Sequence, residues 1–174
     1  MGKYFDPFFI YDNKNFKRVE RRSHRKKSHM AKTKYITVEG PVKWAHYLFK
    51  EGMDTKFGEK FILQMYPDAK SKLVLKEAGY RGKWHEDEDG DWTKFSRDNK
   101  KTFADRVEEF GPPKVSDSNG KEWDSGVSIG NGSVCSAQLE VFPSKYGVGS
   151  RLMEVRVLEH VPYEKVDTEN GPPV

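Results

Sequence analysis

The stretch with the clearest chemical potential is "DWTKFSRDNKK", residues 91–101, in which aromatic rings alternate with basic side chains. Its candidate contact residues are Trp92, Lys94, Phe95, Arg97, Lys100 and Lys101. Single-stranded nucleic acid requires this mixture, because a ring stacks on a base for ~1–3 kcal/mol and cations neutralise the phosphates. Side chains alternate along a strand, so Trp92 and Lys94 share one face while Phe95 and Arg97 share the other. We therefore expect one ring to be buried and the other exposed.

A second, weaker patch of the same kind lies in "MDTKFGEK", residues 53–60, at the entrance to a predicted strand. It contributes Lys56, Phe57 and Lys60. The remaining candidates for nucleic-acid contact are Trp44, Tyr66 and, in the turn between the last two predicted strands, Tyr146 and Arg151. Each patch also has an ordinary interpretation, because rings pack in cores and lysines are commonly only solvated.

No pattern in the sequence indicates an enzyme or a metal site. In "HEDEDGDW", His85 and Ser96 stand where a calcium loop needs a carboxylate and a glutamate, so an acidic turn is the better interpretation. The histidines lack paired metal spacing, and the glycine patterns of phosphate and dinucleotide sites are missing. Cys135, the single cysteine, excludes an internal disulfide and is expected to be a small core residue. We predict a protein without catalytic activity, metal or cofactor.

The charge of the 174-residue chain is unevenly distributed. The net charge is +4, but residues 1–30 hold nine basic and three acidic residues, which leaves 22 basic and 24 acidic residues in the remainder. A polyanion would therefore have to bind a local basic patch of the folded part. No run approaches the roughly 18 apolar residues that span a bilayer, and no signal peptide is recognisable. We expect a soluble protein that does not enter membranes, in a reducing, cytoplasmic setting.

The first 32 residues read as a basic and aromatic leader. Its run "FKRVERRSHRKK" is typical of a solvated arm, with nucleic-acid contact as the alternative. "SHM" at 28–30 resembles the remnant of a cloning site, and "MAKTKYITVEG" reads as a protein start, so the leader is expected to be an addition. We predict one domain over residues 33–164 and a flexible tail over 165–174.

Alternation and turn residues predict a mainly β domain. The predicted strands are "KYITVEG" (34–40), "EKFILQMYP" (59–67), "DWTKFSRD" (91–98), "SVCSAQLEVF" (133–142) and "SRLMEVRVLEHV" (150–161). Asp68 and Gly79 bracket a predicted helix over 68–79, and the spacing of Phe103, Val107 and Phe110 favours a second over 99–111. Residues 41–52 are expected to form a short helix or an irregular connection, and Asn119-Gly120 a hairpin turn.

These elements suit a five-stranded, OB-fold-like, closed antiparallel barrel with one or two short helices and long loops. Cys135, Ala137, Leu139 and Val141 are expected to face its interior from one strand. Met153, Val155 and Val157 are expected to face it from the next. The glycines before both strands are expected at barrel corners.

The order "KYITVEGPVKWAHY", "DTKF", "WTKFSR", "FGPPKVSDSNGKEW", "IGNGSVCSAQLEVF" and "YGVGSRLMEVRVLEHVPYE" resembles the single-stranded DNA-binding proteins of tailed bacteriophages, over about residues 34–164. The resemblance implies an OB-fold that coats single-stranded DNA without strong sequence preference during phage replication and recombination, in the cytoplasm of the infected host cell. The family's binding strand maps onto Phe95, Arg97, Lys100 and Lys101.

The resemblance also implies phage DNA polymerase or helicase as partners. However, the family's acidic tail with an aromatic end has no match in "PYEKVDTENGPPV", which puts recruitment through the tail in doubt. The alternative function is an OB-fold protein-interaction module of a replication complex, without strong DNA affinity of its own.

Overall fold

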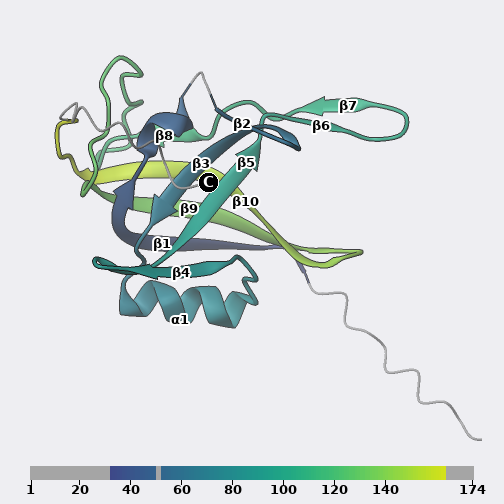
Figure 1. Cartoon of the computed structure of the whole chain (residues 1–174), viewed down its shortest axis with the longest axis horizontal. Coiled ribbons are helices and arrows are strands. Elements are labelled where there is room, and N and C mark those ends of the chain that lie inside the picture. The colour runs from purple at the N-terminus through teal and green to yellow at the C-terminus, as the bar shows by residue number, and fades with distance from the viewer. Residues whose placement is uncertain (1–31, 50–51, 164–174) are drawn as a thin grey trace, which may run out of the picture.

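The structure is a computed structural model that describes residues 32–49 and 52–163. The predicted leader, apart from its last residue, and the predicted tail lie outside these ranges. The described part is mainly β, with one α-helix beneath the sheet in the view of Figure 1. None of its helices is long and apolar enough to cross a membrane.

Most strands belong to one large, strongly bent sheet. Its hydrogen-bonded order is β4-β5-β3-β1-β9-β10-β8, with β2 added to β3, while β6 and β7 form a separate hairpin. The bounds are β1 Lys34–Lys43, β2 Met53–Thr55, β3 Gly58–Met65, β4 Trp84–Asp87, β5 Gly90–Asp98, β6 Lys100–Thr102, β7 Val107–Glu109, β8 Lys114–Ser116, β9 Val134–Ser144 and β10 Gly147–Glu159; the helices are the 3₁₀ turn η1 Ala45–Leu48 and α1 Ala69–Ala78.

Strand β1 is shared by two parts of this sheet because it bends at Gly40. Residues 34–41 pair with β9, while Val42 and Lys43 pair with the end of β3. At the bend, a β-carbon on Gly40 would stand 2.1 Å from the carbonyl oxygen of Tyr66, so only glycine allows this approach of two backbones. The predicted first strand is therefore confirmed, and it runs three residues further than predicted.

The sheet does not close into a barrel, which corrects the closed antiparallel barrel expected from the sequence. Strands β5 and β10 approach each other, but the contact is made by a side chain: Arg97 Nη1 donates to the carbonyl oxygen of Leu152 over 3.4 Å. Because a guanidinium lies where a ladder would form, the two strands exchange no backbone pairs. The short strand β8 also pairs with β10 in parallel, so the sheet is mixed.

Helix α1 forms where the sequence predicts it. The Asp68 side chain accepts a hydrogen bond from the backbone N–H of Ser71 over 2.7 Å, which satisfies a free donor of the first turn. Gly79 ends the helix with φ +79°. The Ser71 hydroxyl accepts from the N–H of Glu39 over 2.8 Å, so the helix is fixed to β1.

The second predicted helix, over 99–111, is wrong: these residues form the β6–β7 hairpin. The N–H of Phe103 donates to the carbonyl of Arg106 over 2.7 Å and closes the turn. Lys100 pairs with Glu109 across the hairpin over 2.8 Å. Apolar residues at helical spacing stabilise a helix only when they pack against another element, and Val107 remains 58% exposed. A helix needs such a buried face more than it needs the spacing.

The last two long strands confirm the predicted faces with one correction. Cys135, whose thiol pKa is raised by burial to about 12, lines the core with the three other predicted residues of β9. In β10, Val155 and Val157 face the core as predicted, but a bulge between Leu152 and Glu154 directs Leu152 inward and leaves Met153 half-buried. An extra residue in one strand shifts the alternation by one, which periodicity alone does not reveal.

Candidate nucleic-acid interface

Lys60 of β3 and Trp92 and Lys94 of β5 lie on the face of these strands that points away from the core, whereas Phe95 and Arg97 lie on the other face. In the ladder, Lys60 stands opposite Asp98, Ile62 opposite Ser96, and Gln64 opposite Lys94. Tyr66 follows the end of β3, and Trp92 pairs with His85 of β4. We call this surface the outer face; its residues are Lys60, Ile62, Gln64, Tyr66, His85, Asp87, Trp92, Lys94, Ser96 and Asp98. It is ~20 Å long, at ~3.3 Å per residue.

Neither ring of "DWTKFSRDNKK" is exposed, which corrects the expectation that one of them would be. Phe95 is 1% exposed and packs in the core. Trp92 faces outward but is only 7% exposed, because the imidazole of His85 stacks on it with the centroids 4.1 Å apart and the planes at 12°. Lys94 Nζ lies 5.7 Å from the Trp92 centroid and is the accessible cation of this strand.

A hydrogen-bonded network holds the same end of the outer face. Gln64 Nε2 donates to the Tyr66 hydroxyl over 3.0 Å, and this hydroxyl donates to Asp87 over 2.6 Å. Burial raises the pKa of Tyr66, and the hydrogen bond from Tyr66 holds the pKa of Asp87 below its ordinary value. Lys43 Nζ lies 5.0 Å from the Tyr66 centroid. The hydroxyl of the predicted contact residue Tyr66 is thus engaged in hydrogen bonds within the sheet, and Lys43 lies over its ring.

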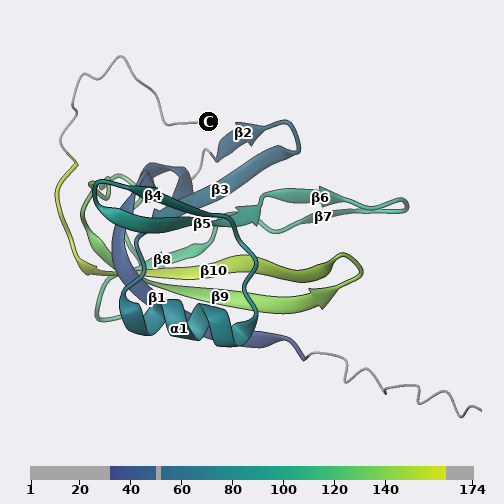
Figure 2. The same cartoon turned by 60° about the horizontal axis from the view of Figure 1, so that its bottom comes forward.

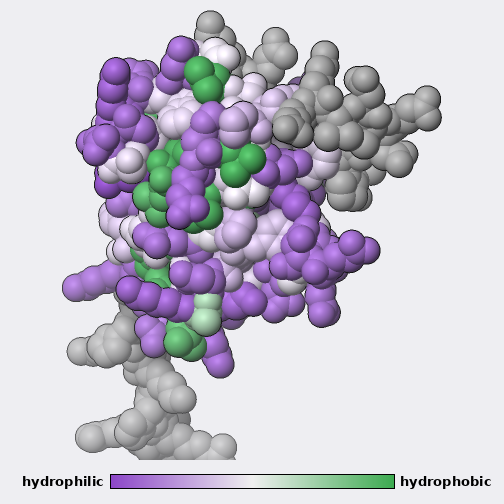
Figure 3. Space-filling model, turned by 90° about the vertical axis from the view of Figure 1, so that its left-hand side faces the viewer, coloured by the Kyte–Doolittle hydropathy of each residue, from purple (hydrophilic) through white to green (hydrophobic). Residues whose placement is uncertain are grey.

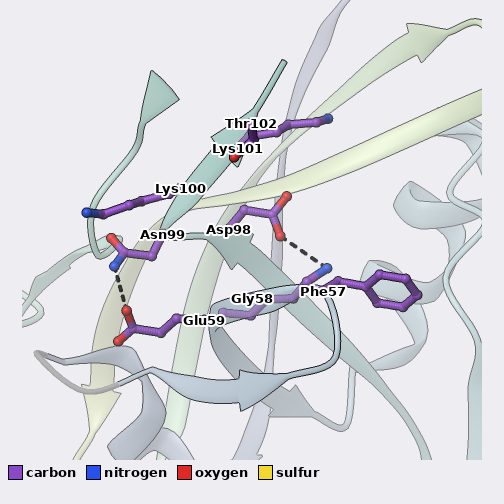
Figure 4. A pocket seen from close by; sticks show the side chains of 9 residues that line it. Phe57, Gly58, Glu59, Asp98, Asn99, Lys100, Lys101 and Thr102 are labelled. Atoms are coloured by element: carbon purple, nitrogen blue, oxygen red, sulfur yellow. Dashed lines mark hydrogen bonds and ion pairs between the residues drawn. The ribbon is translucent and has the colours of Figure 1, made fainter. Parts of the chain in front are cut away.

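A groove of about 510 Å³ opens at the other end of the outer face, between the β2–β3 turn and the start of β6 (Figure 4). Lys60 and Asp98 form an ion pair of 3.1 Å in it, and Asn99 donates to Glu59 over 2.6 Å. Figure 4 shows Lys100 and Lys101 pointing to opposite sides of their strand. The predicted Lys60, Lys100 and Lys101 therefore meet at one groove, although the first two are already paired with carboxylates.

The most exposed rings of the predicted set lie at two hairpin tips built to the same plan. The β2–β3 turn reads Thr-Lys-Phe-Gly (55–58) and the β9–β10 turn reads Ser-Lys-Tyr-Gly (144–147). In each, the hydroxyl of the first residue accepts the N–H of the ring residue over 3.2 Å, and the glycine has positive φ, +102° and +116°. We call them the twin tips.

Each of the twin tips presents a ring with a lysine beside it. Phe57 is 76% exposed and Tyr146 is 87% exposed. Lys56 Nζ lies 5.0 Å from the Phe57 centroid, and Lys145 Nζ lies 4.8 Å from that of Tyr146. The two hairpins extend from the same side of the molecule (Figures 1 and 2). Both rings and Lys56 were predicted from the sequence, whereas Lys145 was not, although the repeated Lys-ring-Gly pattern indicates it.

A third hairpin, β6–β7, extends from that side as well (Figure 2). Near its tip, Phe103 is half-buried between Lys101 Nζ at 5.6 Å and the Arg106 guanidinium at 5.0 Å. Phe103 was not among the predicted contacts, because its spacing with Val107 and Phe110 favoured a helix. Apolar side chains also reach the surface on the opposite side of the molecule, but in groups interrupted by hydrophilic ones (Figure 3).

Arg97 and Arg151, both predicted contacts, lie together between β5 and β10. Arg97 donates to the carbonyls of Phe110 and Gly111 over 2.8 and 2.9 Å, in addition to Leu152. Burial and the neighbouring Arg151 lower the pKa of Arg97. Arg151 lies in β10 rather than in the turn, pairs with Glu140 over 3.4 Å and covers the Phe110 ring at 4.3 Å. Both guanidinium groups therefore fasten the base of the β6–β7 hairpin.

Trp44 stands apart from the other candidates. It precedes η1 with φ +58°, and its N–H donates to the Asn131 side chain over 3.0 Å.

Within the described ranges, no ion pair joins Lys56, Lys94 or Lys145 to a carboxylate. The same ranges hold no group of three or more His, Cys, Asp or Glu side chains that could ligate a metal ion.

Neither a protein-family model nor a curated protein sequence matches the chain significantly. Solved structures do. The chain is similar to gp2.5, a single-stranded DNA-binding protein encoded by bacteriophage T7, with 20% identity and a TM-score of 0.56 over 82% of this chain and 100% of that one. It also matches the single-stranded DNA-binding protein from bacteriophage Enc34 in complex with single-stranded DNA, with 14% identity and a TM-score of 0.49 over 75% of this chain and 89% of that one. The first match shows that the chain shares the fold of a phage single-stranded DNA-binding protein.

Proposed function

We propose that the protein binds single-stranded DNA and that it acts without catalysing a reaction. The observation that carries this proposal is the pair of twin tips, because each offers an exposed ring and a lysine that pairs with no carboxylate of the described residues, at the side where the groove opens. Bases stack on such rings irrespective of their sequence, and cations follow the phosphates. The fold shared with the T7 protein supports the same function.

The arrangement of the strands also supports it. OB-folds bind oligonucleotides on the face of their second and third barrel strands and with the loops that join strands one to two and four to five. Here β3 and β5 carry the outer face, while the β2–β3 turn and the β9–β10 turn occupy those two connections. We assign base stacking to the rings of the twin tips, and phosphate contact to Lys56 and Lys145 beside them, to Lys94 and to Lys101 of the groove.

The wider role is part of the proposal. A protein that coats single strands without strong sequence preference protects them and removes hairpins ahead of a polymerase. We place this role in phage replication and recombination in the cytoplasm of the infected host cell, with the folded domain as the binding unit and a polymerase or helicase as partner.

Titration with oligo-dT at two salt concentrations tests the function. We expect tight binding that weakens steeply as salt rises, because each neutralised phosphate releases counterions. Duplex DNA of the same length is the control. Affinity for single strands no better than for duplex at moderate salt would contradict the proposal, and unchanged binding after charge reversal at Lys56, Lys94, Lys101 and Lys145 would favour a protein-interaction module instead.

A further inference from the structure

A pocket lined by two aromatic rings lies on the face of β4 opposite to the outer face. It has a volume of about 440 Å³ and is formed by α1, the residues that follow it, and the edges of β4 and β5. We call it the α1/β4 pocket; it is lined by Lys72, Leu75, Lys76, Tyr80, Trp84 and Asp91. Trp84 and His85 are neighbours in β4, so their side chains point to opposite faces of this strand. The pocket is therefore separated from the outer face only by the sheet edge that β4 forms.

Trp84 is held in place with much of its ring uncovered. It remains 40% exposed although it lies in a strand. The edge of the Tyr80 ring packs against it, with centroids 6.5 Å apart and planes at 87°. Tyr80 is itself fixed, because its hydroxyl lies 2.9 Å from Thr93 Oγ1 and its ring packs on Phe95 at 5.6 Å. Trp84 is thus held in position and still has an exposed part of its ring, whereas His85 covers the face of Trp92.

The segment that runs from α1 to Trp84 is strongly basic. Residues 69–84 contain five basic residues and one acidic residue, Glu77. The basic residues are Lys70, Lys72, Lys76, Arg81 and Lys83. Within the described ranges, only Lys72 among these is held in an ion pair, with Asp91 over 2.9 Å. This concentration of positive charge contrasts with the net negative charge of residues 31–174 as a whole, and it complements a polyanion.

The pocket is continuous with the proposed DNA path at two places. Lys83 immediately precedes Trp84, and its carbonyl accepts from Thr93, the neighbour of Lys94 in β5, over 2.8 Å. Arg81 Nη1 lies 3.6 Å from the position that a β-carbon on Gly147 would take, so its guanidinium reaches the β9–β10 tip. Arg81 therefore brings a cation between the β9–β10 tip and the segment that leads to Trp84, and Lys83 brings a second one to the start of β4.

We propose that the α1/β4 pocket binds a nucleotide of the same single strand, which passes round the β4 edge and stacks a base on Trp84 while its phosphates meet Lys76, Arg81 and Lys83. This inference rests on the proposed function. The cations are spread along a path of several residues rather than gathered on one side of the pocket, which suits a chain of regularly spaced phosphates better than an acidic peptide. The pocket thus lengthens the binding site beyond the twin tips.

The test compares oligo-dT of two lengths, because only the longer one can fill both regions. OB-fold sites range from about 4 to about 16 nucleotides, so strands of about six and about sixteen are suitable. We expect Trp84→Ala and Lys83→Glu each to weaken binding of the long strand about tenfold at low salt, and to leave the affinity for the short strand within about twofold of the wild type. Trp84→Ala loses one stacked base, worth ~1–3 kcal/mol, and Lys83→Glu loses a phosphate contact. Lys83 is exposed, so Lys83→Glu should keep the wild-type melting temperature, and unchanged affinity for the short strand shows that Trp84→Ala, which loses its contact with Tyr80, still folds.

Lys121→Glu is the matched control, since it makes the same charge change at an exposed lysine outside the pocket, and it should lower the affinities for both strands equally. Equal affinities of wild type and Trp84→Ala for the long strand would overturn the proposal, as would Trp84 quenching by an acidic peptide in place of DNA. Failure of the wild type to bind either strand would instead overturn the proposed function itself, so the two failures are distinguishable.

Discussion

The outer face of β3 and β5 and the twin tips combine a ring with a lysine, yet they differ in what the ring already contacts. On the outer face, Trp92 is stacked against His85 and 7% exposed. At the tips, Phe57 and Tyr146 each have the neighbouring lysine beside them and are 76% and 87% exposed. A base can stack only on a ring face that is free, so the twin tips can stack bases and the outer face cannot, although both combine a ring with a lysine.

The difference follows from where each ring stands in a sheet. A strand always has neighbours, and the register of β4 with β5 brings His85 directly opposite Trp92. A two-residue turn has no neighbouring strand to cover it, so its side chains extend into solvent. The tips are therefore suited to transient stacking, and the outer face to a firm platform beneath the phosphates.

The largest expected effect separates core rings from contact rings. Phe95→Ala should lower the free energy of unfolding by about 3–5 kcal/mol, because a buried ring leaves a cavity. Urea denaturation followed by circular dichroism measures this loss. The fraction that stays folded should bind oligo-dT with the affinity of the wild type. A reduced affinity of that folded fraction would indicate that Phe95 contacts DNA.

The twin tips should control affinity without affecting stability. Phe57→Ala combined with Tyr146→Ala should cost ~1–3 kcal/mol of binding for each ring, since each loses one stacked base. The melting temperature should not change, because both rings are exposed. Tyr163→Ala, at a ring that is 48% exposed but lies in neither tip, provides the control. If the double variant bound as the wild type does, the outer face would have to carry the stacking.

The lysines of the twin tips should appear in the salt dependence. Replacing Lys56 and Lys145 by Gln should reduce the slope of log affinity against log salt by about 1.4, at ~0.7 for each phosphate contact of a single strand. Titrations at four salt concentrations give the slope. The same replacement at Lys60 and Lys100 serves as the comparison, because carboxylates already neutralise both lysines. An equal reduction of the slope in that variant would contradict a special role of the tip lysines in phosphate contact.

The smallest effect concerns acid. The pKa of Asp87 is lowered from its ordinary 3.8, first by the hydrogen bond from Tyr66. A lowered pKa stabilises the fold above pH 3.8, and this contribution is lost as the pH falls through the folded value. Tryptophan and tyrosine signals of the outer face should therefore change below pH 4 in the wild type. Tyr66→Phe should abolish that step, whereas a step that persists would assign it to another carboxylate.

Local sequence patterns determined several parts of the molecule. The strand at 59–67, the capped helix α1 and the buried face of β9 were predictable because alternation, the Asp68 cap and a terminal glycine act within a few residues. The candidate ring and lysine at the β2–β3 turn were recognisable for the same reason. The similarity of its plan to the β9–β10 turn was also present in the sequence.

Only the tertiary structure decided which of these residues are available to a ligand. His85 covers Trp92 because β4 pairs with β5, and Arg97 fastens a hairpin because β10 lies opposite it. The helix predicted over 99–111 gave way to a hairpin, and a single bulge reversed the faces around Met153. Each of these outcomes depends on contacts between residues far apart in the chain. Residue type and spacing thus determined which side chains suit DNA, while the burial set by long-range pairing decided which of them can reach it.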